Sequence, residues 1–334
     1  MQAHALSFVA PRRVEISVLE LPETGPGQTL VATRYSGLSA GTELLAYRGE
    51  IDPALPLDET LGALSGTFSY PFRYGYSCVG TVEGGDGGLP EGSLVFAYHP
   101  HQDRFVVDTG TLIPLGQVDP RQATLFPLVE TALQISLDAG PVQEERVVVM
   151  GLGAVGILTG ALLGRAGARV IGAEPCAWRR QAAAAFGITA VDPVELDDVI
   201  GAETGGTGVP LVVEASGNPG ALASALGLLA HEGVVLAASW YGTKDVVLPL
   251  GGAFHRRRLT IRSTQVSTIP SPLARRWTVE RRRAAVLRLL AELPLGVLAT
   301  HEFPFPEAAR AYALLDRGEE GLVHAALSYG GTSG

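Results

Sequence analysis

RVVVMGLGAVG, residues 146–156, is the stretch of sequence that decides the fold of this chain. Its β-branched run predicts a buried strand, and the glycines that follow have the spacing G-x-G-x-x-G at the start of a predicted helix. In such a unit the first glycine allows a tight turn, the second lets the backbone approach a pyrophosphate, and the third lets helix and strand pack closely. The amides and dipole of the helix start hold phosphate. We therefore expect a dinucleotide to contact Gly151, Gly153, Ala154, Val155 and Gly156. Val155 would lie against the nicotinamide or in the core.

Glu174 ends the next predicted strand, 23 positions after Gly151. A carboxylate at this distance accepts hydrogen bonds from the ribose hydroxyls and repels a 2′-phosphate, which favours NAD(H) over NADP(H). Arg179 and Arg180 follow five and six positions later. Arg179 is a candidate cofactor contact, and NADP(H) becomes possible if the two arginines turn inward. The alternative is that both face solvent on the next helix.

The strand-and-helix rhythm continues outward from this motif. Between 119 and 266 strands alternate with helices, one of them ending near His231, which predicts a parallel sheet covered on both faces. Residues 3–111 are short apolar runs cut by Gly and Pro, typical of a β-rich domain. LTIRSTQV (259–266) should complete the sheet, a helix is predicted over 274–292, and LVHAALSY (322–329) should return to the first domain. We predict a catalytic domain of residues 1–118 and 267–334 and a dinucleotide-binding domain of residues 119–266.

The composition excludes several classes of protein. With 46% hydrophobic and 18% charged residues, 334 residues can bury a large core, so the chain is not disordered. A net charge of −9 argues against nucleic acid, which needs a basic partner face. Cys78 and Cys176 are too few for a disulfide framework or a four-thiolate zinc site. No stretch reaches the roughly 18 apolar residues of a membrane span. We expect a cytoplasmic protein that acts on a small molecule and does not contact the membrane.

The order of a β-rich domain, a dinucleotide fold and a returning strand resembles the medium-chain dehydrogenase/reductase superfamily over the whole chain. SGL, TE and YRG (36–49), YGY and GTVE (74–83) and EASGN (214–218) are similar to its landmarks. SAGTE, YGYSCVG, PHQDRFVV, ETAL and SWYG are similar to the bacteriochlorophyllide 3-hydroxyethyl dehydrogenase group. The resemblance implies a GroES-like β-rich catalytic domain plus a Rossmann domain with a doubly wound parallel sheet. It also implies a cofactor contact at Ser216 and a homodimer formed near 259–266.

The resemblance also identifies where zinc alcohol dehydrogenases hold their catalytic metal. The matching positions here are Ala40 or Gly41, Tyr76 and Phe126. None is a strong zinc ligand, so we expect a zinc-free enzyme. HPHQD (99–103) has ligand-type residues at close spacing, but adjacent strand positions point to opposite faces. Pocket lining is the favoured interpretation of this segment, and metal binding is the alternative.

Without a metal, side chains must move the hydroxyl proton and stabilise the oxyanion during hydride transfer. By the resemblance, Thr42 lies where the superfamily has a hydroxyl of the proton relay, and Tyr76 replaces a ligand histidine on the same wall. A turn cap and a space-filling ring are the alternatives for these two. His99 is a candidate general acid or base, because histidine titrates near neutral pH. His101 and Gln102 are candidate substrate contacts, and the alternative for both histidines is the surface.

Three further positions follow from the expected cofactor site. Glu130 would orient the nicotinamide amide or join the proton relay, or else lie on a helix surface. Trp240 and Tyr241 follow a predicted strand whose carboxyl end should meet the cofactor. Trp240 is a candidate substrate contact and Tyr241 a candidate cofactor contact, with a loop aromatic cluster as the alternative.

These patterns predict an NAD(H)-dependent, zinc-independent oxidoreductase that interconverts a secondary alcohol and a ketone on a fairly large substrate. One alternative is reduction of an activated C=C bond with NADPH, as quinone and enoyl reductases do, and Glu174 counts against it. The other is a non-catalytic dinucleotide-binding protein. The sequence leaves open the substrate, the direction of the reaction and the residue that transfers the proton.

Overall fold

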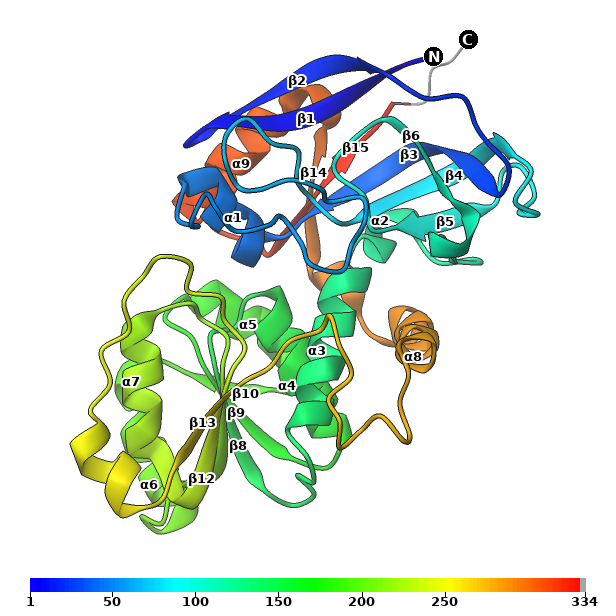
Figure 1. Ribbon diagram of the computed structural model, residues 1–334. Helices are drawn as coiled ribbons and strands as arrows, with labels where there is room; N and C mark the ends of the chain where they lie inside the picture. The colour runs from blue at the N-terminus through cyan, green and yellow to red at the C-terminus, as the bar shows by residue number, and fades with distance from the viewer. Residues whose placement is uncertain (331–334) are drawn as a thin grey trace. The chain divides into compact units, whose positions relative to one another are not determined.

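The computed structural model describes residues 1–330 and divides the chain into two compact units (Figure 1). Unit 1 contains Met1–Pro127 and the residues from Leu287 onward, and unit 2 contains Leu128–Val286. The chain passes from one unit to the other within α3 (Phe126–Asp138) and within α8 (Val279–Glu292). The domain limits expected after residues 118 and 266 stay predictions, and residues 331–334 of the expected first domain lie outside the described residues.

Unit 2 is built on a six-stranded parallel sheet in the order β10-β9-β8-β11-β12-β13. The strands are β8 (Arg146–Met150), β9 (Arg169–Ala173), β10 (Thr189–Val191), β11 (Val209–Glu214), β12 (Leu229–Ala237) and β13 (Thr260–Ser263). Val147, Val148 and Val149 of the central strand β8 have no exposed surface. Burial on both faces is typical of a parallel sheet between helices, and it confirms the predicted doubly wound fold.

Helices cover both faces of this sheet. They are α4 (Ala154–Arg165), α5 (Ala177–Ala184), α6 (Leu196–Thr204) and α7 (Pro219–Leu228). Figure 1 shows α6 and α7 on one face and α4 on the other. The helix expected to reach about His231 ends at Leu228, because β12 starts at Leu229 and pairs with Val209 of β11. The helix expected from residue 274 begins at Val279, where the Thr278 hydroxyl accepts the amide hydrogen of Arg281.

Unit 1 contains a seven-stranded mixed sheet and a separate hairpin. The sheet has the order β14-β15-β3-β4-β5-β7, with β6 paired to β3. Its strands are β3 (Gln28–Leu38), β4 (Cys78–Gly85), β5 (Leu94–Ala97), β6 (Arg104–Asp108), β7 (Ile113–Pro114), β14 (Ala299–Pro304) and β15 (His324–Ser328). The hairpin is β1 (Gln2–Ala10) with β2 (Arg13–Glu20). The predicted returning strand is β15, which pairs antiparallel with β3.

Three helices complete unit 1: α1 (Ala40–Arg48), α2 (Pro120–Ala123) and α9 (Ala308–Arg317). An aromatic core lies where α1 and α9 meet β1. Phe8 stacks on Phe72 at 5.2 Å and meets Tyr312 edge-on at 5.4 Å, and Tyr47 stacks on Tyr312 at 5.3 Å. Aromatic pairs of this geometry stabilise a core beyond their buried area, and this one holds the last turn of α1, which contains Tyr47, against α9. Across residues 1–330, every helix is too short or too polar to cross a bilayer.

Candidate active site

The glycine turn of unit 2 follows the carboxyl end of β8. Gly151 has φ +90°, and a Cβ there would lie 2.6 Å from the Cα of Ser216. A Cβ on Gly156 would lie 1.9 Å from the Gly151 carbonyl oxygen. A Cβ on Gly153, in contrast, would meet no atom within 4 Å. Two glycines are therefore required by packing, whereas Gly153 leaves open space over the backbone, as a pyrophosphate needs.

The start of α4 faces that space. Gly153 is the N-cap of α4, and Ala154 and Val155 form its first turn. Both side chains are half-buried. Backbone amides at a helix start bind anions, so these residues fit the phosphates of a dinucleotide.

Glu174 lies beside the same turn and is 3% exposed. Its Oε2 accepts the Leu152 amide hydrogen at 2.9 Å, and its Oε1 accepts the Cys176 amide hydrogen at 3.1 Å. A carboxylate has about four lone-pair sites, so it retains capacity for a ribose hydroxyl. The same bonds hold the carboxylate against the glycine turn.

The two arginines after Glu174 are partly exposed, and both interact with Glu174 or with the backbone beside it. Arg180 donates from Nη1 to the carbonyl oxygens of Glu174 and Pro175. Arg179 Nη1 lies 3.9 Å from Glu174 Oε2, and its guanidinium is 4.9 Å from the centre of the Trp178 ring. Arg180 is held by backbone carbonyls because the strand end exposes them, whereas Arg179 lies beside the Glu174 carboxylate.

A second buried carboxylate, Glu214, ends β11 and has no exposed surface. It accepts hydrogen bonds from the Ser216 amide at 2.7 Å, from the Ser216 hydroxyl and from the Tyr241 hydroxyl. Burial first, and then the hydrogen bond to Glu214, raises the pKa of Tyr241 far above its usual value. Ser216 and Tyr241 are thus fixed at the carboxyl edge of the sheet beside Gly151. Trp240 directly precedes Tyr241 and is 41% exposed.

Glu130 does not lie on a helix surface. Its side chain is 4% exposed and accepts a hydrogen bond from Arg282 Nε at 3.0 Å, with Arg283 Nε at 3.8 Å. The expected role in orienting a nicotinamide amide needs a carboxylate that faces the cofactor. In this structure the carboxylate is instead committed to a buried ion pair.

Thr42 and Tyr76 come together in unit 1. Thr42 is half-buried in the first turn of α1, and Tyr76 follows a loop that packs against that turn. The Tyr76 hydroxyl donates to the Ser39 hydroxyl and is also hydrogen-bonded to Thr42. Burial, then the charge of Glu43, raises the pKa of Tyr76 to about 12, so Tyr76 is protonated at neutral pH. The predicted pair is therefore in direct contact, with Ser39 as a third member.

His101 has no exposed surface, which corrects its expected role as a substrate contact. Its Nε2 lies 3.0 Å from Glu43 Oε2 and its Nδ1 lies 2.7 Å from the Ser36 hydroxyl. The Ser36 hydroxyl lies 2.9 Å from the Tyr329 hydroxyl, and Tyr312 donates its hydroxyl to Glu43. Both ring nitrogens of His101 are taken up by this buried network.

The structure also corrects the expected neutral-pH titration of His99. Its ring stacks on Phe105 at 4.0 Å, and its Nδ1 donates to the Pro100 carbonyl at 2.9 Å. Burial lowers the pKa of His99 to about 4, so this residue is neutral at pH 7. Gln102 is 2% exposed, donates to the Arg104 carbonyl and accepts a hydrogen bond from Arg73 at 3.4 Å. The side-chain amide of Gln102 is thus hydrogen-bonded to residues of unit 1.

The three positions that match the zinc ligands do not fit a metal. Ala40 offers no donor atom, Tyr76 donates its hydroxyl to Ser39, and Phe126 stacks on Phe96 at 4.6 Å in the core. Over residues 1–330 no group of three or more His, Cys, Asp or Glu side chains is arranged to hold a metal ion. The donor set of a tetrahedral zinc site is thus not supplied by these residues.

Glu43 is a buried, multiply bonded residue that is not among the candidates predicted from the sequence, although it lies in the TE landmark. The signal available was an acidic residue inside the apolar helical run GTELLAY (41–47), where a solvated charge is not expected. Glu214 likewise lies in a landmark for which the sequence predicts no role. Two partners of Glu43 lie 58 and 269 positions away, and Glu214 is bonded to Tyr241 across 27 positions as well as to the nearby Ser216.

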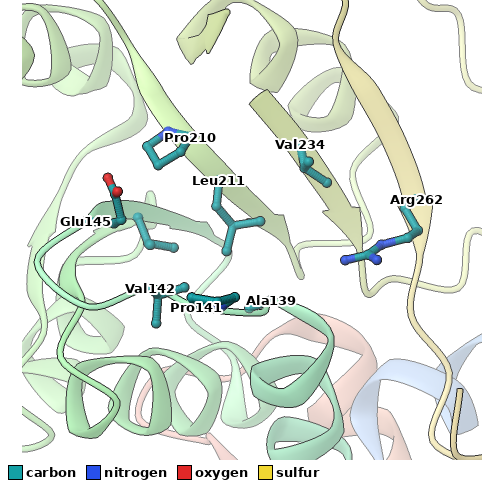
Figure 2. A pocket seen from close by; sticks show the side chains of 9 residues that line it. Ala139, Pro141, Val142, Glu145, Pro210, Leu211, Val234 and Arg262 are labelled. Carbon is teal, nitrogen blue, oxygen red and sulfur yellow. The ribbon is translucent and has the colours of Figure 1, made fainter. Parts of the chain in front are cut away.

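A separate pocket opens near the amino ends of β8 and β11 (Figure 2). Its volume is about 130 Å³, and apolar side chains such as Val142 and Leu211 line it, with Glu145 and Arg262 at its edges. The glycine turn follows the opposite, carboxyl end of β8. This pocket therefore does not belong to the dinucleotide site.

Comparison with known proteins agrees with this arrangement. Residues 154–279 match the family described as zinc-binding dehydrogenase. The chain is 28% identical to 2-desacetyl-2-hydroxyethyl bacteriochlorophyllide A dehydrogenase of Cereibacter sphaeroides, over 94% of each chain. It is 26% identical to L-galactonate-5-dehydrogenase of Escherichia coli over 62% of this chain, and the match spans 58% of that enzyme.

Solved structures share the fold over nearly the whole chain. The alcohol dehydrogenase of Thermus sp. ATN1 superposes with a TM-score of 0.75 at 23% identity, over 98% of this chain and 100% of that one. An Escherichia coli alcohol dehydrogenase complexed with NADH gives 0.78 at 17% identity, over 98% and 99%. A zinc-binding dehydrogenase of Sinorhizobium meliloti bound to NADP gives 0.76 at 18% identity, over 98% and 99%. These likenesses establish the fold of alcohol dehydrogenases in this chain.

Proposed function

We propose that this chain, which belongs to the medium-chain dehydrogenase/reductase superfamily, is an NAD(H)-dependent, zinc-independent oxidoreductase that interconverts a secondary alcohol and a ketone on a fairly large substrate. The observation that carries the proposal is the glycine turn at 151–156 with Glu174 bonded to the Leu152 amide. The relatives described above are dehydrogenases, which supports the same class of reaction.

The residues of unit 2 fit a dinucleotide. Gly153 leaves the space for a pyrophosphate, the first turn of α4 supplies amides, and Glu174 retains lone pairs for a ribose hydroxyl. When bound, the nicotinamide accepts or supplies the hydride. Ser216 and Tyr241, fixed by Glu214, are proposed to line the same edge of the sheet.

The buried carboxylate of Glu174 favours NAD(H), because a 2′-phosphate would bring a second negative charge beside it. Arg179, whose Nη1 lies 3.9 Å from that carboxylate, acts in the opposite direction. We weigh Glu174 more heavily because its two backbone hydrogen bonds hold it in place, whereas the Arg179 side chain is 30% exposed.

The proton of the substrate hydroxyl needs an acceptor within unit 1. The hydroxyl cluster of Tyr76, Ser39 and Thr42 provides it, and Tyr76 is the member that we propose to exchange a proton with substrate. A protonated phenol also stabilises the negative charge that develops on a carbonyl oxygen. This role replaces the Lewis acid, because Ala40, Tyr76 and Phe126 do not supply zinc ligands.

Calorimetric titration with NADH and NADPH tests the cofactor assignment. We expect NADH to bind at least about tenfold more tightly, a difference of about 1.4 kcal/mol. Glu174→Gln should remove most of that preference, whereas Glu195→Gln, an exposed acid on the same unit, should keep it. Equal affinity of the wild-type protein for both nucleotides would refute the role of Glu174.

A second experiment tests the reaction and the metal. Nicotinamide absorbance is followed with 2,3-butanediol, L-threonine and larger secondary alcohols, on protein whose metal content has been measured. We expect turnover of a secondary alcohol with far less than one zinc per chain. Activity that appears only after zinc is restored would refute the zinc-independent assignment.

We also propose a cytoplasmic homodimer. β13 is the edge strand of the parallel sheet of unit 2, so its outer side can pair with a second copy. Sedimentation should give twice the mass of 34.9 kDa. A monomer at working concentrations would contradict this assignment.

A further inference from the structure

Unit 1 contains a buried chain of polar side chains that the proposed reaction does not use directly. The chain runs from Tyr329 through Ser36 and His101 to Glu43. Ser36 and His101 have no exposed surface, and Glu43 is 1% exposed. A buried carboxylate is costly unless every lone pair that faces the protein has a donor. Glu43 nevertheless lies in α1, whose other buried side chains are apolar or aromatic.

Glu43 is satisfied by three partners, one in the preceding turn of the chain and two that are distant in the sequence. Oε1 accepts the Ser39 amide hydrogen at 2.8 Å. Oε2 lies 3.0 Å from His101 Nε2 and accepts the hydroxyl hydrogen of Tyr312. The carboxylate therefore joins the first turn of α1 to the loop at 99–103 and to α9.

The Glu43 network reaches Tyr76 by two routes. The first is Ser39, whose amide is bonded to Glu43 and whose hydroxyl accepts the hydrogen of Tyr76. The second is Gly75, which has φ +106° and where a Cβ would lie 2.5 Å from Cδ2 and Nε2 of His101. The residue before Tyr76 thus lies directly on the imidazole that Glu43 holds.

We propose that Glu43 is a positioning residue for Tyr76. Through the Ser39 amide it fixes the residue whose hydroxyl accepts the Tyr76 hydrogen, and through His101 it fixes the imidazole on which Gly75, the residue before Tyr76, packs. This inference rests on the proposed function only in giving Tyr76 a substrate. The Glu43–His101 pair itself is enclosed and does not touch the substrate.

The charges around Tyr76 agree with this role. The titratable groups that face Tyr76 are Glu43 on α1, Asp58 in the following loop, Tyr74 beside it and Tyr312 on α9. Burial and then Glu43 raise the pKa of Tyr76, whereas the hydrogen bonds with Ser39 and Thr42 lower it. At neutral pH Tyr76 therefore carries its proton, so it can act as a proton donor but not as a base.

The protonation state of Tyr76 decides which direction of the reaction it assists at neutral pH. In ketone reduction the carbonyl carbon gains a hydride, with its electron pair, from the reduced dinucleotide, which becomes oxidised. The carbonyl oxygen gains the Tyr76 proton, and water returns a proton to the tyrosinate. Alcohol oxidation is the reverse and needs tyrosinate at the start, so its rate should rise with pH up to the pKa of Tyr76.

The test measures Tyr76 ionisation without turnover. Protein labelled with carbon-13 at the tyrosine phenol carbon is titrated by NMR, and Tyr76→Phe identifies the resonance. Glu43→Gln removes the negative charge and keeps the shape of the side chain. When the His101 ring changes its tautomer, the amide introduced at position 43 keeps a hydrogen bond to that ring. We expect the Tyr76 pKa to fall by about half a unit or more, a threefold or larger change in the ionisation constant. A change below about 0.2 unit in a folded Glu43→Gln protein overturns the inference.

Two variants complete this test. Glu43→Asp keeps the charge, so it should restore the Tyr76 titration toward the wild-type value. Glu307→Gln removes an exposed acid of unit 1 that is paired with Arg310, and it should leave the titration unchanged. A Glu307→Gln effect as large as that of Glu43→Gln would show that overall charge, not this network, sets the pKa.

If Glu43→Gln does not fold, Ser39→Ala gives the decisive result, because it removes a single hydroxyl. The hydrogen bond with the Ser39 hydroxyl lowers the Tyr76 pKa, because that hydroxyl can turn and donate to the tyrosinate. The inference therefore requires the Tyr76 pKa to rise when the hydroxyl is lost, and an unchanged titration overturns the link through Ser39. Because this measurement needs no substrate, it is independent of the proposed function. Full activity of Tyr76→Phe would refute the proposed role of Tyr76 in the reaction while leaving the titration result standing.

Discussion

Arg282 donates from Nε to the Glu130 carboxylate at 3.0 Å, and the two side chains are only 3% and 4% exposed. The same guanidinium donates to Gln134 Oε1 and to the Val266 carbonyl. One buried arginine thus connects α8, α3 and the segment that follows β13. Arg282 lies between Arg281 and Arg283, and such a basic run is typical of a solvated helix face, but the structure buries this arginine against α3.

Arg282→Met should destabilise the protein strongly, because it leaves Glu130 as a buried carboxylate that has lost its main partner. We expect a loss of about 3–5 kcal/mol in the free energy of unfolding, measured by urea denaturation. Arg258→Met, which breaks an exposed pair with Glu232, should cost at most about 1 kcal/mol.

Adding Glu130→Gln to Arg282→Met should recover part of the loss, because the uncompensated charge is removed. Equal costs for Arg282→Met and Arg258→Met would contradict the buried pair.

Three glycine substitutions on one turn and helix should have different effects. Gly156→Ala should cost about 3 kcal/mol of stability or more, because its Cβ would lie 1.9 Å from the Gly151 carbonyl oxygen. Gly153→Ala should leave stability almost unchanged but weaken NADH binding, since its methyl group enters the space proposed for the pyrophosphate.

Gly164→Ala, in the same helix and with no atom within 4 Å of the added carbon, is the matched control for both properties. Thermal denaturation and calorimetric titration of the three variants measure them. Tight NADH binding by Gly153→Ala would argue against a nucleotide at this turn.

Tyr76→Phe should lower the turnover number by about 10²–10⁴-fold, because the hydroxyl that exchanges the substrate proton is lost. The dissociation constant of NADH should not change, since Tyr76 belongs to unit 1 and the nucleotide residues belong to unit 2. Steady-state kinetics and calorimetry separate the two effects.

Tyr70→Phe is the control for that substitution. It removes a hydroxyl of the same unit that is bonded to the Ala46 carbonyl. It should leave the turnover number close to that of the wild-type protein. A decrease equal to that of Tyr76→Phe would indicate a general loss of structure in unit 1.

The stability of the protein should fall between pH 6.5 and 4 because of His324. This side chain is 2% exposed, and burial lowers its pKa to about 4. Its Nε2 donates to the Thr124 hydroxyl at 2.9 Å, and that hydroxyl donates to the Arg121 carbonyl.

The unfolded chain binds a proton at the ordinary histidine pKa near 6.5, whereas the folded chain does not until about pH 4. Stability is therefore full above 6.5 and is lost as the pH falls, by up to about 3 kcal/mol at pH 4. His324→Gln should remove the share of His324 from the pH dependence of urea midpoints, whereas His99, whose pKa burial also lowers to about 4, should keep a similar share. His4, an exposed histidine paired with Asp103, is the control position, and His4→Gln should leave the slope in place.

The sequence by itself determined the elements that follow from short-range patterns. The valine run and the glycine spacing at 146–156 fixed β8, the turn and the start of α4, because period and steric need are local properties. The alternation of strands and helices was sufficient for the parallel sheet, and LVHAALSY was sufficient for β15. The positions of Thr42 and Tyr76 came from the resemblance, and their mutual contact agrees with it.

Only the tertiary structure decided what the buried charged side chains do. Glu43 meets Tyr312 across 269 positions and His101 across 58, and Glu130 meets Arg282 across 152. No local period encodes such pairs, because a carboxylate in a helix has the same short-range pattern whether it faces water or a distant arginine. The free energy that keeps an ionised group buried comes from those distant partners, so its role is fixed when the chain has folded around it.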